Sequence, residues 1–240
     1  MVKSPFLRGT TLTAIVRNEE QNPAGGIVDY CKNILPYVEK AVIIDTGSTD
    51  NTFNLLKKMS KEYSHLSIFQ EEFKGFAQSR NSTLEKVQTE FSLILDADER
   101  FPIRTIYALE EFLENKYQVD GLCFDCYSVT KDKITEDKTS LNPRFFKNTP
   151  GISFKNSRGK VYEELYDKKG NLILNKSCYF LENLKFYHFI GESTKGKNNW
   201  YSYLEKLPPS WKFEIVTPEE FFGYKLCKIF NRKREEISLN

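Results

Sequence analysis

The sequence lacks several features that would assign it to a common class of proteins. Its 240 residues contain no apolar stretch long enough to span a bilayer, and residues 1–9 lack the apolar core of a secretory signal. The formal net charge is only +2, which gives no reason to expect nucleic acid as a partner. We therefore expect a cytoplasmic protein, whose only membrane contact would be peripheral, at the inner face.

Cysteine is scarce, and its distribution argues against a disulfide framework. The five cysteines are odd in number and scattered along the chain, which favours reduced thiols. Cys123 and Cys126 have Cys-x-x-Cys spacing, but they fall within an expected strand. Residues three apart on a strand point to opposite faces, so this pair argues against a zinc site.

Glycine-rich phosphate loops are also absent. The chain has no Gly-x-Gly-x-x-Gly and no Gly-Lys-Ser/Thr segment, which weakens the case for a dinucleotide enzyme or a P-loop kinase. The composition is 40% hydrophobic with 14% aromatic residues, enough to build a sizeable core. The length allows one large domain, or one domain with an appendage.

What the sequence does contain is a regular alternation of strand and helix patterns over the first ~115 residues. This alternation predicts an α/β fold with a mostly parallel central sheet flanked by helices. The expected strands are 12–16, 41–44, 66–69 and 91–95, and the expected helices are 26–35, one after residue 50, 76–87 and 102–114. The later chain predicts a mixed half with strands at 121–129, 141–147 and 172–182 and a charged loop at 130–139.

The end of the chain, residues 214–240, is expected to form a basic amphipathic helix apart from the main domain, residues 1–213. Thr217-Pro218-Glu219-Glu220 is a capping box with proline at the first helical position. Apolar residues then recur at helical spacing among lysines and arginines: Phe222, Leu226, Ile229 and Phe230. Such a helix can rest on an anionic membrane, or it can pack its apolar stripe on its own domain.

An acidic cluster, Asp96-Ala97-Asp98-Glu99, directly follows the expected strand 91–95. Ligands bind at the carboxyl ends of strands in open α/β sheets. Carboxylates at this spacing suit a hard divalent cation, which usually also holds substrate phosphates. The alternative is a solvated acidic turn that caps the next helix.

Polar clusters follow two other expected strands. Arg17-Asn18-Glu19 comes after the first strand and Asp45-Thr46-Gly47-Ser48 after the second. If the strands are parallel neighbours, the three clusters meet at one edge of the sheet and form a single crevice. Each cluster taken alone could be no more than a turn and a helix cap.

Four segments together resemble the family 2 glycosyltransferases of the GT-A fold. They are residues 14–20, 42–52, 77–81 and 93–99, in matching order and spacing. The resemblance is closest to the branch that includes lipopolysaccharide-core glucosyltransferases and the peptide S-glycosyltransferases of bacteriocins. It implies a GT-A domain with a nucleotide-binding half, ~10–115, and an acceptor half, ~116–213.

The resemblance also implies an activity. It is that of a metal-dependent, inverting glycosyltransferase that uses a UDP-sugar and Mn²⁺ or Mg²⁺ in cell-surface glycan assembly, such as lipopolysaccharide or capsule. The acceptor could be a glycan, a lipid-linked intermediate or a peptide. Two other possibilities stay open: a nucleotidyltransferase, and a non-catalytic relative that binds nucleotide-sugars.

Residue roles follow from the resemblance position by position. Asp98 would bind the metal, and His188 resembles a late histidine that completes the metal site. The nucleotide-sugar would be bound by Val16, Asn18, Glu19, Asp45, Gly47, Arg80, Asp96, Ala97 and Lys195. Asp45 and Arg80 would lie near the base and Asp96 near the ribose. Arg80 could instead form a surface ion pair, and His188 could be a core residue.

The second half matches the family less well. Residues 142–148 resemble an Arg-Leu-Phe-Arg-Asn segment, and residues 159–165 resemble a Val-His-Glu segment in which Tyr162 replaces the histidine. An inverting transferase needs a general base to take the acceptor proton. Glu163 is the candidate and Glu164 the alternative, although either could be a salt-bridging surface acid.

Overall fold

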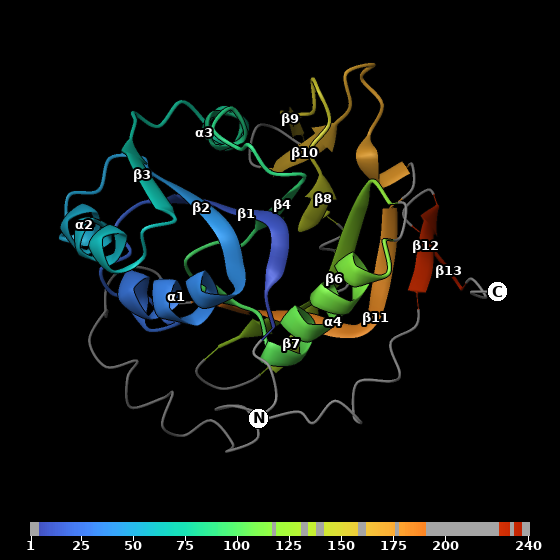
Figure 1. The fold of residues 1–240 in the computed structure, drawn as a ribbon, viewed down its shortest axis with the longest axis horizontal. Helices are drawn as coiled ribbons and strands as arrows, with labels where there is room; N and C mark the ends of the chain where they lie inside the picture. The colour runs from blue at the N-terminus through green and yellow to red at the C-terminus, as the bar shows by residue number, and fades with distance from the viewer. Residues whose placement is uncertain are drawn as a thin grey trace.

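The computed structural model describes residues 5–116, 119–130, 134–137, 142–157, 162–175, 178–190, 226–230 and 233–236 (Figure 1). The helices are α1 (Gly26–Ile34), α2 (Thr52–Glu62), α3 (Phe76–Leu84) and α4 (Ile103–Glu114), with short 3₁₀ helices at Leu35–Tyr37 and Ile173–Asn175. The strands are β1 (Leu7–Val16), β2 (Val38–Asp45), β3 (Leu66–Gln70), β4 (Phe91–Ile94), β5 (Glu99–Arg100), β6 (Gly121–Val129), β7 (Ile134–Asp137), β8 (Phe145–Lys147), β9 (Ser153–Ser157), β10 (Tyr162–Tyr166), β11 (Cys178–Phe189), β12 (Leu226–Phe230) and β13 (Lys233–Glu236).

The predicted parallel sheet is confirmed in the first half of the chain. β1 pairs in parallel with β2 and with β4, and β2 pairs in parallel with β3, so these strands lie in the order β4-β1-β2-β3. Their inner parts, such as Ala14–Val16 and Ala41–Ile44, are apolar because both faces of the sheet are covered. Each predicted helix of this half is also present, within a few residues of its expected bounds.

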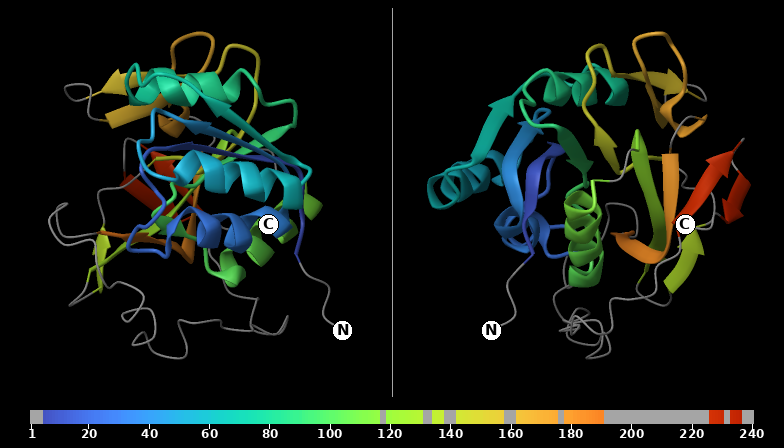
Figure 2. Two further views of the ribbon diagram at one scale, coloured as in Figure 1. Left: turned by 90° about the vertical axis from the view of Figure 1, so that its left-hand side faces the viewer. Right: turned by 45° about the vertical axis from the view of Figure 1, so that its right-hand side comes forward.

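The two faces of the sheet are covered differently (Figure 2). Helices α1, α2 and α4 supply side chains such as Ile27, Leu56 and Leu109 to the main core on one face. On the other face α3 packs with the β9–β10 hairpin, where Ala77 and Phe154 share a smaller core. Among the described residues, helices and a hairpin therefore cover the two faces of the first-half sheet.

The second half of the chain continues the same sheet in a mixed arrangement, as predicted. β8 is antiparallel to both β4 and β6, and β6 is parallel to β11. Four details of the prediction are wrong. The expected strand 172–182 starts later, since Ile173–Asn175 is a 3₁₀ helix and β11 begins at Cys178. The expected strand 141–147 is shorter, since β8 begins at Phe145; the loop 130–139 contains β7; and the β9–β10 hairpin was not expected. Short apolar runs do not distinguish a strand from other buried structure, which explains the first error.

The prediction of a C-terminal helix is wrong where the structure describes that segment. Leu226–Phe230 and Lys233–Glu236 are the antiparallel strands β12 and β13, and β12 pairs with β11. Ile and Phe favour strands as well as helices, and the edge of β11 decides between the two by pairing with this segment. The other residues of the expected helix lie outside the described part of the chain. Among the described helices, none has the length and apolarity needed to cross a membrane.

The order in which strands are added reverses at β1, and this reversal marks a position where an α/β sheet can bind a ligand. The chain adds β2 and then β3 on one side of β1, and it then returns to add β4 on the other side. In open α/β sheets the crevice for a ligand lies at such a reversal, outside the carboxyl ends of the strands. The loops after β1 and β4 carry two of the predicted polar clusters, so both clusters flank this crevice.

Gly26, the first residue of α1, is expected to be intolerant of substitution. Its φ is +83°, and a Cβ added there would lie 2.4 Å from the backbone oxygen of Glu20. Gly26→Ala should therefore lower the free energy of unfolding by about 2–3 kcal/mol, as measured by urea denaturation. Gly9→Ala is the matched control, because Gly9 has a φ of +69° but open space around its Cβ position.

The control should lose only about 1 kcal/mol, the cost of the left-handed backbone alone. Equal losses in the two variants would contradict the assignment of the Gly26 effect to the close approach of the Glu20 carbonyl.

Candidate active site

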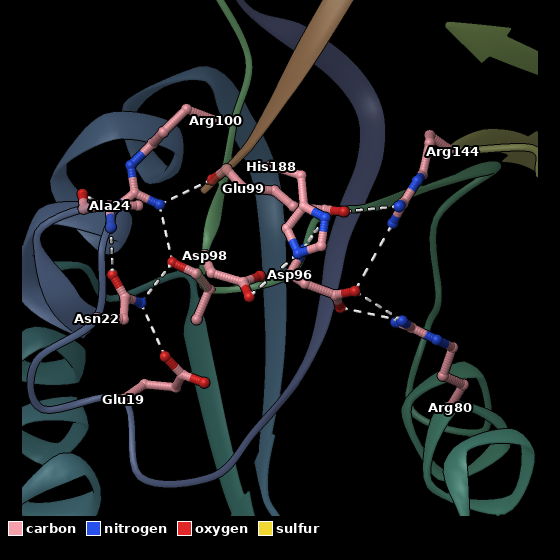
Figure 3. Close-up of polar contacts among 11 residues, drawn as sticks. Glu19, Asn22, Ala24, Arg80, Asp96, Asp98, Glu99, Arg100, Arg144 and His188 are labelled. Atoms are coloured by element: carbon pink, nitrogen blue, oxygen red, sulfur yellow. Dashed lines mark hydrogen bonds and ion pairs between the residues drawn. The ribbon is translucent and has the colours of Figure 1, made fainter. Parts of the chain in front are cut away.

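The turn formed by residues 96–99, here called the acidic turn, follows β4 at the reversal of strand order. Figure 3 shows Asp96, Asp98 and Glu99 of this turn with their polar contacts. The Glu99 backbone N–H donates to the Asp96 carbonyl at 2.9 Å, and the Asp96 N–H donates to Glu99 Oε2, also at 2.9 Å. The Glu99 side chain therefore closes the turn upon itself. Glu99 is only 2% exposed, and this burial raises its pKa to about 7.

Three neighbouring segments hold the remaining carbonyls of the acidic turn. The Ala97 carbonyl accepts hydrogen bonds from Asn22 Nδ2 and Arg100 Nη1, both at 2.9 Å. The Asp98 carbonyl accepts one from the Phe189 N–H at the end of β11, at 2.9 Å. Asn22 also donates to Glu19 Oε2 at 2.8 Å, so it ties the loop after β1 to the acidic turn. The backbone of the turn is thus fixed before any ligand binds.

Asp96 and Arg80 form a two-pronged ion pair at one side of the turn. Nη2 of Arg80, on α3, lies 3.0 and 2.9 Å from the two carboxylate oxygens of Asp96. Arg80 Nε donates to Oε1 of Glu163 on β10. Burial opposes ionisation of Asp96, but Arg80 and Arg144 outweigh it and hold the pKa of Asp96 below its ordinary value. Arg80 therefore links the acidic turn to the candidate base.

Asp98 points to the other side of the turn and faces His188 on β11. Asp98 Oδ2 and His188 Nε2 are 3.4 Å apart, and the two side chains are 34% and 38% exposed. The hydrogen bond with Asp98 raises the pKa of His188. The structure therefore brings together the two predicted metal ligands in an open position. No group of three or more His, Cys, Asp or Glu side chains suited to a metal occurs in the described part of the chain.

Asn18 and Asp45 hold the neighbouring loops in place. Asn18 has a φ of +56°; its N–H donates to Ser48 Oγ at 2.9 Å, and its Oδ1 accepts from the Thr49 N–H at 2.7 Å. Asp45, at the end of β2, is fully buried, and its Oδ1 accepts from the N–H groups of Gly47 and Ser48. Asp45 Oδ2 has no hydrogen-bond partner among the described residues. The loops after β1 and β2 are thus bonded to each other beside the crevice.

A hollow of about 530 Å³ lies at the carboxyl ends of β1, β2 and β3. The residues that line it are Arg17, Thr46, Gly47, Gln70, Glu71, Glu72 and Phe73. The ring of Phe73 is half-exposed and packs edge-on against Phe76, with ring centroids 5.2 Å apart. The hollow offers an aromatic surface, amide and carboxylate groups and one guanidinium to a planar polar ligand.

Other predicted site residues are placed apart from these clusters or outside the described chain. Val16 is buried, and its carbonyl accepts hydrogen bonds from the N–H and hydroxyl of Thr46. Glu164 accepts one from the Tyr166 hydroxyl at 3.0 Å. Because adjacent strand residues point to opposite faces, Glu164 and Glu163 face different sides of β10. Lys195 lies outside the described residues.

Glu99 belongs to the predicted acidic cluster but was given no role of its own, and Asn22, Arg100 and Arg144 were not predicted as site residues. Arg144, just before β8, donates from Nη2 to Glu99 Oε1 at 2.6 Å. A signal for it was present, since Arg144 falls in the segment 142–148 that resembles a family segment. Asn22 and Arg100 donate to backbone carbonyls that only the folded turn brings within reach, so no sequence pattern indicates their roles.

Most of the chain, including the acidic turn, matches the sequence model of a known family. The model of the family described as Glycosyl transferase family 2 matches residues 15–179. The chain belongs to glycosyl transferase family 2. The matched residues include every segment that carries the acidic turn, Arg80 and Glu163.

Part of the chain is also similar in sequence to a bacterial polymerase. A teichoic acid poly(glycerol phosphate) polymerase of Staphylococcus epidermidis is 33% identical over 94 residues, which are 38% of this chain and 13% of that protein. This chain thus corresponds to a small part of that much longer relative.

Solved structures show the same fold as this member of glycosyl transferase family 2. The structure of S. aureus TarS residues 1–349 in complex with UDP-GlcNAc matches with a TM-score of 0.59 and 16% identity, over 82% of this chain and 64% of that one. The structure of GalNAc-T7 with UDP, GalNAc and Mn²⁺ matches with a TM-score of 0.52 and 10% identity, over 77% of this chain and 43% of that one. The predicted GT-A fold is therefore confirmed.

Proposed function

We propose that this protein is an inverting glycosyltransferase that moves a sugar from a UDP-sugar to an acceptor, with a divalent cation on the diphosphate. The observation that carries the proposal is the acidic turn. Its backbone is held by several neighbouring residues, and its two aspartates point in different directions, Asp96 to Arg80 and Asp98 to His188. A solvated acidic cap would need neither this bracing nor these partners.

The donor set suits a Mn²⁺ or Mg²⁺ ion that a substrate helps to bind. Asp98 and His188 would hold the cation, supplying one carboxylate oxygen and one imidazole nitrogen from an open position. Magnesium in particular is usually bound by one or two carboxylates together with substrate phosphates, so two protein ligands are sufficient. When bound, the cation would offset the negative charge that builds up on the departing diphosphate.

The nucleoside would lie in the hollow at the ends of β1, β2 and β3. Phe73 offers an aromatic face to a base. Thr46 and Gly47 form part of the wall, and the buried Asp45 behind them would hold this wall in shape through its hydrogen bonds to the Gly47 and Ser48 N–H groups. Glu19, held by Asn22 beside the acidic turn, would face the nucleoside.

The transfer step would use Glu163 as general base. Arg80 holds Oε1 of Glu163 and thereby orients its carboxylate. The acceptor would give its proton to Oε2 as it attacks the anomeric carbon, and the bond from that carbon to the diphosphate would break on the opposite face. Attack opposite to the leaving group inverts the configuration. The nucleoside diphosphate is then released.

An acceptor in cell-surface glycan assembly is the best-supported choice. The S. epidermidis relative is named for teichoic acid polymerisation, and TarS of S. aureus was solved with UDP-GlcNAc. Membrane contact was expected because the C-terminal segment was predicted to be an amphipathic helix. The described part of that segment is β-strand, so membrane contact is not part of the proposal. The division into a nucleotide-binding half and an acceptor half is part of this proposal.

The proposal is tested by incubating the protein with single UDP-sugars and Mn²⁺ and measuring free UDP. We expect UDP release with at least one UDP-sugar, and its loss when EDTA removes the cation. We also expect the same UDP-sugar to raise the melting temperature more than the others do. Release of pyrophosphate from UTP and a sugar 1-phosphate, with no UDP released from any UDP-sugar, would instead indicate a nucleotidyltransferase. A thermal shift without any turnover, with acceptor extracts present, would indicate a non-catalytic binding protein.

A further inference from the structure

A buried ion pair connects the acidic turn to the second half of the chain. Arg144 lies just before β8, and its Nη2 is 2.6 Å from Oε1 of Glu99. The Arg144 side chain is 14% exposed, and its guanidinium lies over the ring of Phe186, 4.6 Å from the centroid. The pair is therefore fixed in position and largely shielded from water.

The same two residues reach both ends of the acidic turn. Glu99 uses its second oxygen, Oε2, to accept the Asp96 N–H at 2.9 Å. Arg144 places its other terminal nitrogen, Nη1, 3.8 Å from Asp96 Oδ2. Asp98 lies between these anchored ends and directs its side chain toward His188. Movement of Arg144 or Glu99 would thus be transmitted to both aspartates.

Stability alone does not account for such a pair. Removing two charges from water costs several kcal/mol per ion, and replacing a buried pair by apolar residues is often neutral or stabilising. In contrast, partners that orient metal ligands commonly change metal affinity by 10- to 100-fold when they are mutated. What points to a role beyond stability is the position of the Arg144–Glu99 pair, which contacts the backbone N–H and approaches the carboxylate of Asp96 at the start of the acidic turn.

We infer that Arg144 and Glu99 act together as positioning residues that hold the acidic turn in the conformation in which Asp98 binds a cation–diphosphate complex. This inference rests on the proposed function. Neither residue needs to contact the substrate, because both act through the backbone and carboxylate of Asp96. The second half of the chain thereby sets the geometry of the donor site in the first half.

The test compares Glu99→Gln, Arg144→Gln and the double variant with the wild type. Mn²⁺ binding is measured in the presence of UDP from the EPR signal of free Mn²⁺, and UDP binding without metal is measured by calorimetry. We expect each single variant to bind Mn²⁺ about 10- to 100-fold more weakly, with metal-free UDP binding changed less than about twofold. The double variant should be no worse than Arg144→Gln alone, because the two residues act as a unit.

The matched controls are Glu90→Gln and Lys147→Gln. Lys147 lies at the end of β8, three positions after Arg144, and its Nζ forms an exposed ion pair with Glu90 Oε1 at 3.1 Å. These variants remove the same charges from the same strand region without touching the acidic turn. Their Mn²⁺ affinity should equal that of the wild type. If a glutamine variant does not fold, Arg144→Lys replaces it, with an intermediate loss expected because lysine keeps the charge but reaches one partner only.

The outcomes separate this inference from the proposed function. If the wild type binds neither UDP nor Mn²⁺ with UDP, the proposed function fails and the inference fails with it. If the wild type binds both and the variants match it, only the inference is overturned. Losses that multiply in the double variant would also overturn it, because independent effects are not those of a pair. A fall in metal-free UDP binding equal to the fall in Mn²⁺ binding would show general damage to the site, and this too would overturn it.

Discussion

Substitution of Asp98 by alanine is expected to slow sugar transfer by about 1000-fold. Asp98 is the carboxylate proposed to hold the cation on the leaving diphosphate, and Lewis-acid help of this kind contributes several kcal/mol to the transition state. A factor of 1000 corresponds to about 4 kcal/mol. The measurement is the rate of UDP release and of acceptor glycosylation at saturating UDP-sugar and Mn²⁺.

The fold should survive this substitution. Asp98 is held mainly by its backbone, which bonds to Phe189, and the described contact of its side chain is with His188 on the open side of the turn. Melting temperature should therefore stay within a few degrees of the wild type. Glu62→Ala, at an exposed carboxylate at the end of α2, is the control and should keep full activity. Full activity in Asp98→Ala would remove the metal assignment.

Glu163→Gln is expected to lower the transfer rate by about 100- to 10,000-fold, the range found for general bases. Glutamine keeps an oxygen for the Arg80 N–H, so the contact that joins β10 to α3 is preserved. It cannot take the acceptor proton. The fall should therefore be in kcat, with UDP binding nearly unchanged when it is measured by calorimetry.

Glu164→Gln distinguishes between the two candidate bases. Glu164 is the next residue of β10, faces the other side of the strand and bonds to the Tyr166 hydroxyl. We expect this variant to lose less than tenfold in kcat. The assignment of the base would be reversed if Glu164→Gln were the slower of the two. Loss of UDP binding in Glu163→Gln would instead indicate that this residue has a structural role next to Arg80.

The first half of the fold could be predicted from sequence because its signals are local. The apolar run before Asp96 and the apolar stripe of α2 each identify an element without reference to the rest of the chain. The polar clusters after β1, β2 and β4 follow from the same pattern, since parallel strands bring their carboxyl ends to one edge. The placement of Asp98 beside His188 needed the family resemblance as well, because these residues are far apart in sequence.

What could not be predicted depends on contacts between distant segments. The basic stretch around Lys228 has helical spacing, but part of it is strand because β11 offers an edge to pair with. Arg144 and Asn22 belong to the site only because the folded chain brings them to the carboxylate of Glu99 and the carbonyl of Ala97. Such roles depend on how separate helices, strands and loops are placed against one another. Hydrophobic periodicity and capping signals contain no information about that placement.

The position of β4 also affects how this chain reaches its native state. β4 (Phe91–Ile94) has β1 (Leu7–Val16) on one side and β8 (Phe145–Lys147) on the other, so both of its neighbours are distant in sequence. Folding rates fall when the contacts that must form join distant residues, because the entropy of closing long loops is lost before those contacts are gained. During synthesis the middle of the sheet must wait for β8 to be made. Until then one edge of β4 is open to unwanted pairing, and a chaperone that covers this edge would raise the yield of folded protein.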